Sequence, residues 1–221
     1  MKFIYCIGFV FIGFVIYLWA KDSGKSTSCK GNIVKDTTVT FKPEVNMALL
    51  RSKAQAAKAF CNKRDFNTKF CLLIDMSLHS GLKRFFVWDL KGDSIMHRFM
   101  VAHGCCDSPW SYAFTKDDPG FSNTDGSHCS SLGKYRLGKR AYSEWGVGIK
   151  YIMHGLESSN SNAESRLIVF HSWDEITDDE IYPDGTVEGW GCPTLSNNSF
   201  KIVDPMIKAS KKPVLMWIYK D

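Results

Sequence analysis

Short apolar runs separated by turn signals dominate the sequence from residue 70 onward. Three of them, residues 71–75, 84–90 and 94–101, are rich in β-branched and aromatic side chains. Ser80-Gly81 and Lys91-Gly92-Asp93 stand between these runs. This spacing predicts a meander of antiparallel strands. Later runs predict further strands at residues 133–138, 147–153, 166–170 and 214–219.

Two segments have a helical rather than a strand-like pattern. Residues 43–61 repeat apolar side chains with a helical period around an alanine-rich middle. Residues 197–208 predict a short helix that Pro205 interrupts. Residues 105–131 are rich in Ser, Asp, Pro and Gly without periodicity, and a loop of that length is usually functional or disordered. The predicted fold class is mainly β with peripheral helices.

An uncharged stretch of 18 residues, 3–20, opens the chain between Lys2 and Lys21. It is longer than the ~7–15-residue core of a signal peptide and approaches the ~20 residues that span a bilayer. Because no clean small-x-small cleavage site follows, we favour a hydrophobic helix that anchors the chain in a membrane over a removed signal peptide. Both alternatives predict export. The expected organisation is a signal peptide or anchor at 1–20, a polar linker at 21–42 and one domain at 43–221.

The charge distribution argues against nucleic acid as a partner. Of the formal net charge of +5, the first 32 residues hold +3, which leaves +2 for the rest of the 221-residue chain. Nucleic-acid-binding domains normally display a clustered basic face. We therefore expect no nucleic-acid partner, and membrane contact only through the N-terminal segment if that segment is not cleaved.

Export changes how the eight cysteines are interpreted. Cys6 lies in the apolar stretch, Cys192 is considered below, and the other six can form disulfides in an oxidising compartment. These six are Cys29, Cys61, Cys71, Cys105, Cys106 and Cys129. Adjacent cysteines rarely bond each other, and we predict that Cys105 or Cys106 bonds Cys129. The alternative is a zinc site, because these three cysteines lie near His128 and His103 in the sequence, although no Cys-x-x-Cys pair is present.

A cysteine between glycine and proline follows a strand that ends in a histidine. The run Leu167-Ile168-Val169-Phe170 leads into His171-Ser172, and Cys192 lies twenty-one residues later in Gly-Trp-Gly-Cys-Pro. An imidazole near a thiol can generate the reactive thiolate at neutral pH, and flanking glycines let backbone N–H groups approach a substrate carbonyl. The alternative is a buried structural cysteine, because free cysteines are among the most buried residues.

The order of these elements resembles the L,D-transpeptidase (YkuD-type) catalytic domain. The cysteine motif Trp190-Gly191-Cys192-Pro193 is similar to that of the murein L,D-transpeptidase-like branch of the family. The resemblance runs from about Phe70 to Tyr219. Further similar blocks are found at residues 73–77, 87–90, 101–104, 121–127, 130–135, 155–157 and 162–166.

The resemblance implies a β-sandwich-like domain with the cysteine at one end of a cleft. It also implies that Cys192 attacks the carbonyl of the third residue of a peptidoglycan stem peptide and expels the terminal D-alanine. An amine from a second stem would then resolve the thioester into a cross-link, which makes the protein an L,D-transpeptidase. If water resolved it, the protein would be an L,D-carboxypeptidase. The implied place of action is the bacterial cell envelope or periplasm.

The family's site roles fall on particular residues of this sequence. His171 is the expected base and acid, the backbone of Ser172 orients it, and the N–H groups around Trp190 and Gly191 are expected to stabilise the oxyanion. Candidate substrate-binding residues are His128, Asn162, Arg166 and Trp173. The resemblance implies no metal and no organic cofactor.

Trp190 departs from the family pattern, in which a second histidine usually lies two positions before the cysteine. This departure transfers the whole proton-transfer role to His171 unless another histidine enters the site. A domain that binds peptidoglycan without turning it over is therefore a second hypothesis, and a zinc-stabilised envelope module with an inert Cys192 is a third.

Overall fold

The computed structural model describes residues 41–221, which form one compact unit. The predicted N-terminal helix and most of the predicted linker fall on residues 1–40, outside the described part of the chain. Among the described residues, no helix is both long and apolar enough to cross a membrane.

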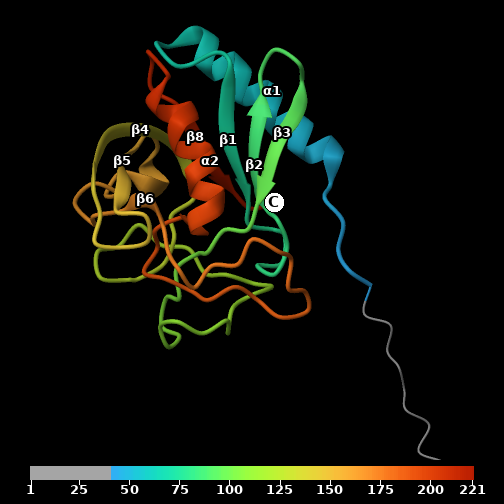
Figure 1. Ribbon diagram of the computed structural model, residues 1–221, viewed down its shortest axis with the longest axis vertical. Helices are drawn as coiled ribbons and strands as arrows, with labels where there is room; N and C mark the ends of the chain where they lie inside the picture. Colours follow the sequence, from blue (N-terminus) through green and yellow to red (C-terminus); the bar gives the residue numbers. More distant parts are fainter. Residues whose placement is uncertain (1–40) are drawn as a thin grey trace, which may run out of the picture. The chain divides into compact units, whose positions relative to one another are not determined.

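Eight strands form one mixed sheet in the order β3-β2-β1-β8-β4-β5-β6-β7 (Figure 1). The strands are β1 Phe70–Asp75, β2 Phe85–Asp89, β3 Ser94–Phe99, β4 Gly133–Tyr142, β5 Ile149–Gly155, β6 Val169–Ser172, β7 Thr194–Leu195 and β8 Leu215–Tyr219. The predicted meander is confirmed, because β1 pairs antiparallel with β2 and β2 with β3. The mainly β fold class is confirmed as well.

The continuous sheet corrects the expectation of a sandwich, and the reason is the C-terminal strand. β8 pairs parallel with β1 on one side and antiparallel with β4 on the other, so it joins the N-terminal meander to the β4–β6 strands. Four of its five residues are buried. A nearly continuous apolar run of this kind fits a central strand that is covered on both faces.

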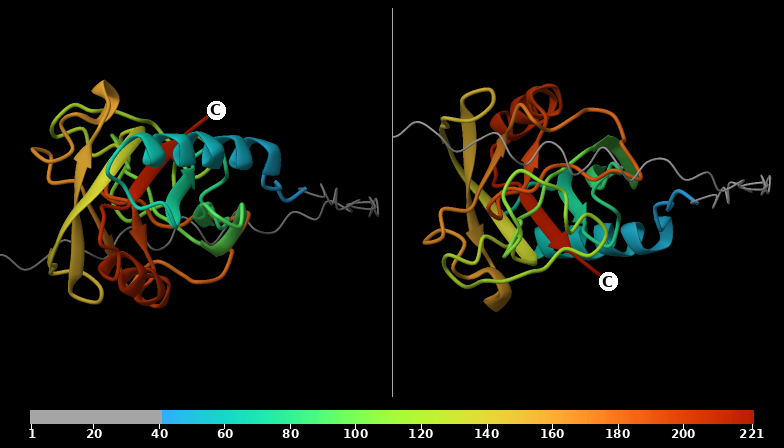
Figure 2. Two further views of the ribbon diagram at one scale, coloured as in Figure 1. Left: turned by 90° about the horizontal axis from the view of Figure 1, so that it is seen from above. Right: turned by 90° about the horizontal axis from the view of Figure 1, so that it is seen from below.

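Two helices cover the sheet from opposite sides, each over its own core. α1, Met47–Lys63, packs Leu50, Ala54 and Ala57 on the cluster that contains Leu73 of β1. α2, Asn197–Lys208, belongs to the larger cluster on the other side. Figure 2 shows the two helices on opposite sides of the sheet.

Pro205 does not interrupt α2, contrary to the prediction. The helix is continuous over 12 residues, with Pro205 in its last turn. Proline removes one backbone donor there, but Phe200, Val203 and Ile207 are buried in the core on the same helix. Tertiary packing therefore outweighs the local cost of the proline.

The two edges of the sheet approach each other along a seam, so that the sheet nearly closes into a barrel. The segment after β3 forms isolated bridges between Ala102 and Thr194 and between Gly104 and Gly189. Thr194 begins β7, a two-residue strand that the sequence did not predict. Residues 190–193 lie between the bridged positions Gly189 and Thr194, and they include Cys192. The seam therefore places the candidate nucleophile at the irregular junction of the sheet.

Candidate active site

A cavity of about 200 Å³ lies beside the seam and brings together residues that are far apart in the sequence. Four tryptophans form most of its wall. The lining residues are Trp110, Trp145, His171, Trp173, Gly189, Trp190, Cys192 and Thr194. The two residues singled out from the sequence, Cys192 and His171, therefore share one cavity.

The Cys192 thiol is partly exposed and is held at the start of β6. Its Sγ accepts a hydrogen bond from the Val169 N–H at 3.4 Å and lies 3.9 Å from the carbonyl oxygen of Leu167. Burial raises the pKa of this thiol, and the Val169 N–H and the positive charge of Arg166 act in the opposite direction. The thiol is therefore neutral near pH 7, and its activation requires a base.

His171 is the next-to-last residue of β6, and a backbone carbonyl fixes its ring. Its Nδ1 lies 2.9 Å from the carbonyl oxygen of Ser172, which only accepts, so Nδ1 carries the proton and Nε2 is free to accept one. Nε2 lies 3.3 Å from Oγ1 of Thr194. Burial lowers the pKa of His171, the hydrogen bond to Ser172 raises it in part, and Lys150 lowers it further. A neutral imidazole with an open Nε2 can serve as a base near pH 7.

The turn between β4 and β5 supports the carbonyl that orients His171. The Val147 N–H donates to Oγ of Ser172 at 3.0 Å. Gly146 has φ +56°, and a Cβ at this position would lie 2.4 Å from the carbonyl oxygen of Ser172. Only glycine allows this approach. The same turn carries Trp145 into the cavity wall, a contribution that the sequence did not reveal.

Gly191 shapes the backbone immediately before the cysteine. Its φ is +99°, and a Cβ would lie 2.5 Å from the carbonyl oxygen of Cys129. Between Phe41 and Asp221, no acceptor is found for the N–H groups of Trp190, Gly191 or Cys192. Unpaired donors beside a nucleophile are the chemical requirement of an oxyanion hole.

Thr194 is a site residue that the sequence did not predict. The parallel register of β6 and β7 places it opposite His171. Its hydroxyl donates to the carbonyl oxygen of Cys192 at 3.1 Å and lies within reach of His171 Nε2. A two-residue strand leaves no periodic signal, so only its position two residues after Cys192 could have drawn attention to it.

The other predicted site residues lie in different places. Trp173 is buried and lines the cavity. His128 is exposed and stacks on Trp190, with ring centroids 5.3 Å apart. Asn162 is exposed, and both its backbone and its side chain bond Asn123. Neither His128 nor Asn162 lines the cavity.

Arg166 holds the loop that precedes β4. Its guanidinium donates to the carbonyl oxygens of Ser122 and Cys129, both at 2.8 Å, and to the hydroxyls of Ser127 and Ser131. The Cys129 carbonyl is the group that contacts Gly191. The contacts of Arg166 therefore stabilise the backbone on which the cysteine segment rests.

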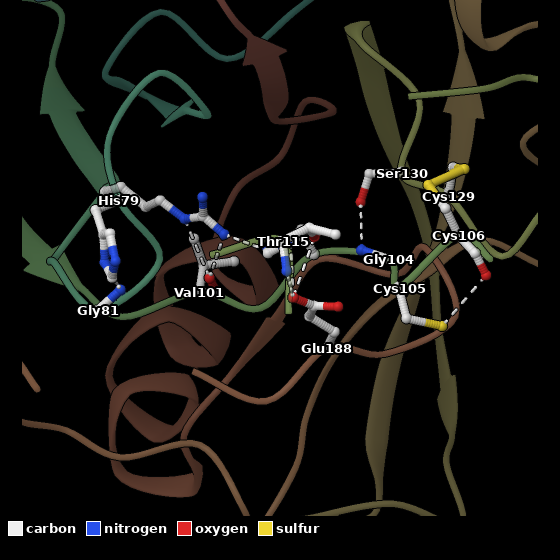
Figure 3. Close-up of polar contacts among 12 residues, drawn as sticks. His79, Gly81, Val101, Gly104, Cys105, Cys106, Thr115, Cys129, Ser130 and Glu188 are labelled. Carbon is white, nitrogen blue, oxygen red and sulfur yellow. Dashed lines mark hydrogen bonds and ion pairs between the residues drawn. A yellow bond between two sulfur atoms is a disulfide. The ribbon is translucent and has the colours of Figure 1, made fainter. Parts of the chain in front are cut away.

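A buried polar network lies behind the cysteine segment. Arg84 Nη2 donates to Nδ1 of His103 at 2.7 Å, and His103 Nε2 lies 2.8 Å from Thr115 Oγ1. Glu188 Oε1 accepts from the backbone N–H and the hydroxyl of Thr115, which face it in Figure 3. Arg84, His103 and Glu188 are each fully buried.

Burial shifts the pKa of each ionisable group in this network. Burial lowers the pKa of Arg84 to about 9, so the guanidinium stays charged near pH 7. Burial raises the pKa of Glu188, and the positive charge of Arg84 lowers it in part. His103 has a pKa well below its ordinary value, because of burial first and Arg84 second. A neutral His103 thus links a buried cation to the carboxylate that immediately precedes Gly189.

The disulfide between Cys106 and Cys129 confirms the predicted pairing (Figure 3). It joins the two ends of the long loop, 23 residues apart in the sequence. The zinc hypothesis loses two of its ligands, because disulfide sulfurs are not thiolates. In the part of the chain that the structure describes, no group of three or more His, Cys, Asp or Glu side chains is placed to hold a metal ion.

Comparison with known proteins tests which family the chain belongs to. No curated protein matches the chain. Solved structures that match it include the helical cell shape determining protein Pgp2 from Campylobacter jejuni and a lysine-to-alanine variant of it. They are 13% and 11% identical, with a TM-score of 0.41 each. The matches cover 79% and 80% of this chain but only 55% and 57% of theirs.

A family model gives the stronger result. The model described as the L,D-transpeptidase catalytic domain matches residues 41–219. This range holds the whole sheet, both helices and every residue that lines the cavity. The family is one of enzymes that act on peptidoglycan. The chain belongs to the L,D-transpeptidase catalytic domain family.

Proposed function

We propose that the protein is a cysteine-dependent peptidoglycan L,D-transpeptidase. The donor is a stem peptide that ends in D-alanine, and the product is a cross-link between two stems. The observation that carries this proposal is the cavity that Cys192 and His171 both line, next to N–H groups of residues 190–192 that have no acceptor within residues 41–221. A nucleophile, a base and oxyanion donors are the three parts that acyl transfer needs.

In the first half-reaction, the thiol proton of Cys192 passes to His171 Nε2 as the sulfur attacks the carbonyl of the third stem residue. Sγ contacts the Val169 N–H in the resting protein, so rotation about its Cα–Cβ bond must bring it towards the ring. Catalytic hydrogen bonds often tighten in this way only when substrate binds. The carbonyl oxygen becomes an oxyanion, which the free N–H groups stabilise.

Collapse of the tetrahedral intermediate breaks the peptide bond and forms a thioester on Cys192. The D-alanine amine leaves with the proton that His171 took from the thiol. In the second half-reaction, an amine of another stem attacks the thioester and gives a proton to His171. The thiolate departs and is reprotonated, which restores the enzyme.

The apolar wall of the cavity favours the amine over water as the acceptor. Four tryptophans line the cavity beside Cys192, and Thr194 is the only lining residue with a side-chain hydroxyl. An apolar lining offers few hydrogen-bond partners to hold a water molecule against a thioester. The carboxypeptidase reaction, which needs water at the same carbonyl, is therefore the less favoured outcome.

Intact-protein mass spectrometry tests the proposal directly. The full-length protein in detergent is incubated with a tetrapeptide-stem muropeptide, beside Cys192→Ala and the control Cys105→Ala. Cys105 is also a free cysteine close to the site, but it is buried outside the cavity lining. We expect a thioester adduct and free D-alanine from the parent and from Cys105→Ala, and neither from Cys192→Ala.

Product analysis then separates cross-linking from trimming. A cross-linked dimer supports the transpeptidase, whereas a tripeptide stem alone supports the carboxypeptidase. Binding of the muropeptide without adduct or D-alanine would overturn catalysis and leave a peptidoglycan-binding domain.

The role of His171 has its own signature in the pH dependence. Protonation removes the acceptor at Nε2, so adduct formation must slow as the pH falls through the pKa of His171. Because burial lowers that pKa, we expect the midpoint of the fall in rate to lie below pH 6.5, the ordinary histidine value. Stopped-time mass spectrometry from pH 4.5 to 8 measures this. His171→Ala should be slower by about 10²-fold or more.

A further inference from the structure

A continuous series of aromatic rings runs along the candidate active site. Trp145 contacts Trp173 at a centroid distance of 6.0 Å, Trp173 stacks on Trp110 at 5.4 Å, and Trp110 contacts Trp190 at 5.9 Å. His128 stacks on the far side of Trp190 at 5.3 Å. We call these five residues the aromatic row. It begins beside the turn that supports His171 and ends outside the cavity.

Three of the four tryptophans in the row are exposed, although they are large and apolar. The exposed fractions are 43% for Trp110, 47% for Trp145 and 59% for Trp190, whereas Trp173 beneath them is 8% exposed. The exposed rings come from three separate segments: the long loop, the β4–β5 turn and the cysteine segment. A contiguous exposed apolar patch of this kind marks a binding surface. Because three separate segments contribute to this patch, the composition of a single loop does not explain it.

The arrangement of the rings indicates which class of ligand the row can bind. Neighbouring rings are in contact, and the stacked pair Trp110–Trp173 is only 13° from parallel. This leaves no space between them for an ammonium ion, which an aromatic cage would surround. Within residues 41–221, the cavity lining contains no carboxylate and no Lys or Arg. The row therefore offers exposed aromatic surface to a ligand, next to a cavity lining without carboxylate, Lys or Arg.

Two kinds of flat ligand stack on such faces. Nucleic-acid bases do so in sites that also supply a basic groove for the phosphates, and this lining lacks one. A pyranose ring carries C–H groups on its apolar face, which are attracted to the negative face of an aromatic ring. Its hydroxyl and amide groups point sideways into water. The uncharged row suits a pyranose better than a base.

We propose that the aromatic row binds N-acetylated sugar rings of the peptidoglycan glycan strand, as a second binding site beside Cys192. The inference rests on the proposed function for the identity of the glycan, because the stem peptide is attached to this strand. The cavity of about 200 Å³ is smaller than the ~300–1,000 Å³ of pockets that enclose a whole small ligand. It holds the reacting part of the stem, while the exposed part of the row contacts the sugar.

A peptide-free saccharide tests the site separately from the chemistry. The probe is the tetramer of N-acetylglucosamine, titrated into the full-length protein in a detergent without a sugar head group and followed by tryptophan fluorescence. We expect saturable binding that Trp110→Leu and Trp190→Leu each weaken at least tenfold. Trp110→Phe, which keeps a ring face, should recover most of it. The control Tyr142→Leu removes an exposed aromatic side chain outside the row and should leave binding unchanged.

The outcomes distinguish this inference from the proposed function. Saccharide binding by a parent protein that forms no thioester would keep the aromatic site and reject the enzyme. Thioester formation without saccharide binding, or with binding that the leucine variants do not change, would reject the aromatic site and keep the enzyme. Tryptophan-dependent binding of lysine amide in place of the saccharide would also overturn the inference, because it would identify a site for ammonium groups.

Discussion

The segment at residues 189–193 has two flanks that differ in almost every physical property. On one flank, the buried network of Arg84, His103, Thr115 and Glu188 is charged, and a side chain or backbone partner fixes each member. On the other flank, the four tryptophans of the aromatic row carry no charge, three of them are exposed, and their rings contact one another. The backbone of Glu188 and Gly189 joins the two.

The difference suits the two flanks to different tasks. The polar flank holds the backbone in place, and the aromatic flank contacts the ligand. Hydrogen bonds have narrow distance and angle requirements, so the polar flank fixes the position of the backbone that carries Cys192. Stacked rings tolerate sliding, so the aromatic flank can adjust to a ligand at little cost. Substitutions on the polar flank should therefore change stability most, and substitutions on the aromatic flank should change binding most.

The largest effect on stability is expected from Glu188→Gln. The amide still offers an oxygen to Thr115 but removes one of the two carboxylates, the other being Asp75, whose charge favours the buried guanidinium of Arg84. Loss of a charged partner from a buried polar network costs about 3 kcal/mol or more. Urea unfolding measures the loss. The control Glu144→Gln, at an exposed position of the β4–β5 turn, should change stability by less than about 0.5 kcal/mol. Equal losses in the two variants would show that the network does not hold the segment.

Removal of the disulfide should have the next largest effect. The Cys106–Cys129 bond closes a loop of 23 residues, so replacement of both cysteines by alanine should lower the free energy of unfolding by about 3 kcal/mol. The measurement is unfolding of the parent and the double variant with and without reductant. Reductant should destabilise the parent alone. An insensitive parent would contradict a stabilising role for this bond.

A matched pair of glycine substitutions tests the junction between the flanks. Gly191→Ala forces a Cβ against the Cys129 carbonyl at a positive φ, whereas Gly189→Ala finds no atom within 4 Å. A backbone shift of about 1 Å near a reacting group can slow the reaction by about 10²-fold. We expect thioester formation to slow by at least tenfold in Gly191→Ala and by less than threefold in Gly189→Ala. Similar rates for both variants would exclude a special role for the Gly191 backbone.

The smallest effect on stability is expected from Trp110→Leu. Its ring is partly exposed and stacks on Trp173, and an aromatic pair of this kind contributes about 0.5–1.5 kcal/mol. Urea unfolding should show a loss of about 1 kcal/mol, well below that of Glu188→Gln. A loss of 3 kcal/mol or more would assign the aromatic flank a structural role and remove the contrast between the flanks.

The sequence predicted the strands that carry a periodic or continuous apolar pattern. Seven of the eight strands and both helices overlap the expected segments, because side-chain burial is visible in the order of residues. The two-residue strand β7 and the parallel pairings of β8 with β1 and β6 with β7 were not predicted, since they depend on contacts between distant segments. The expectation of a sandwich came from the family resemblance, and the single sheet corrects it.

The candidate site shows this limit residue by residue. Cys192 and His171 stand in recognisable motifs, so the sequence could single them out. Thr194, Gly146 and Trp145 carry no such signal, and their positions follow from strand register and a turn with positive φ. Trp110 belongs to the aperiodic loop, where its proximity to the other tryptophans depends on the network around Thr115 and Glu188.

The seam also bears on how the protein avoids self-association. An open sheet presents unpaired N–H and C=O groups at its edges, and these can recruit strands from other molecules. A closed barrel removes that hazard but pairs all of its donors with neighbouring strands. Here the bridges at Ala102 and Gly104 protect the outer edge of β7 while the N–H groups of residues 190–192 stay free. The near-closure of the sheet thus limits edge-to-edge aggregation and still leaves a few backbone donors for an incoming acyl group.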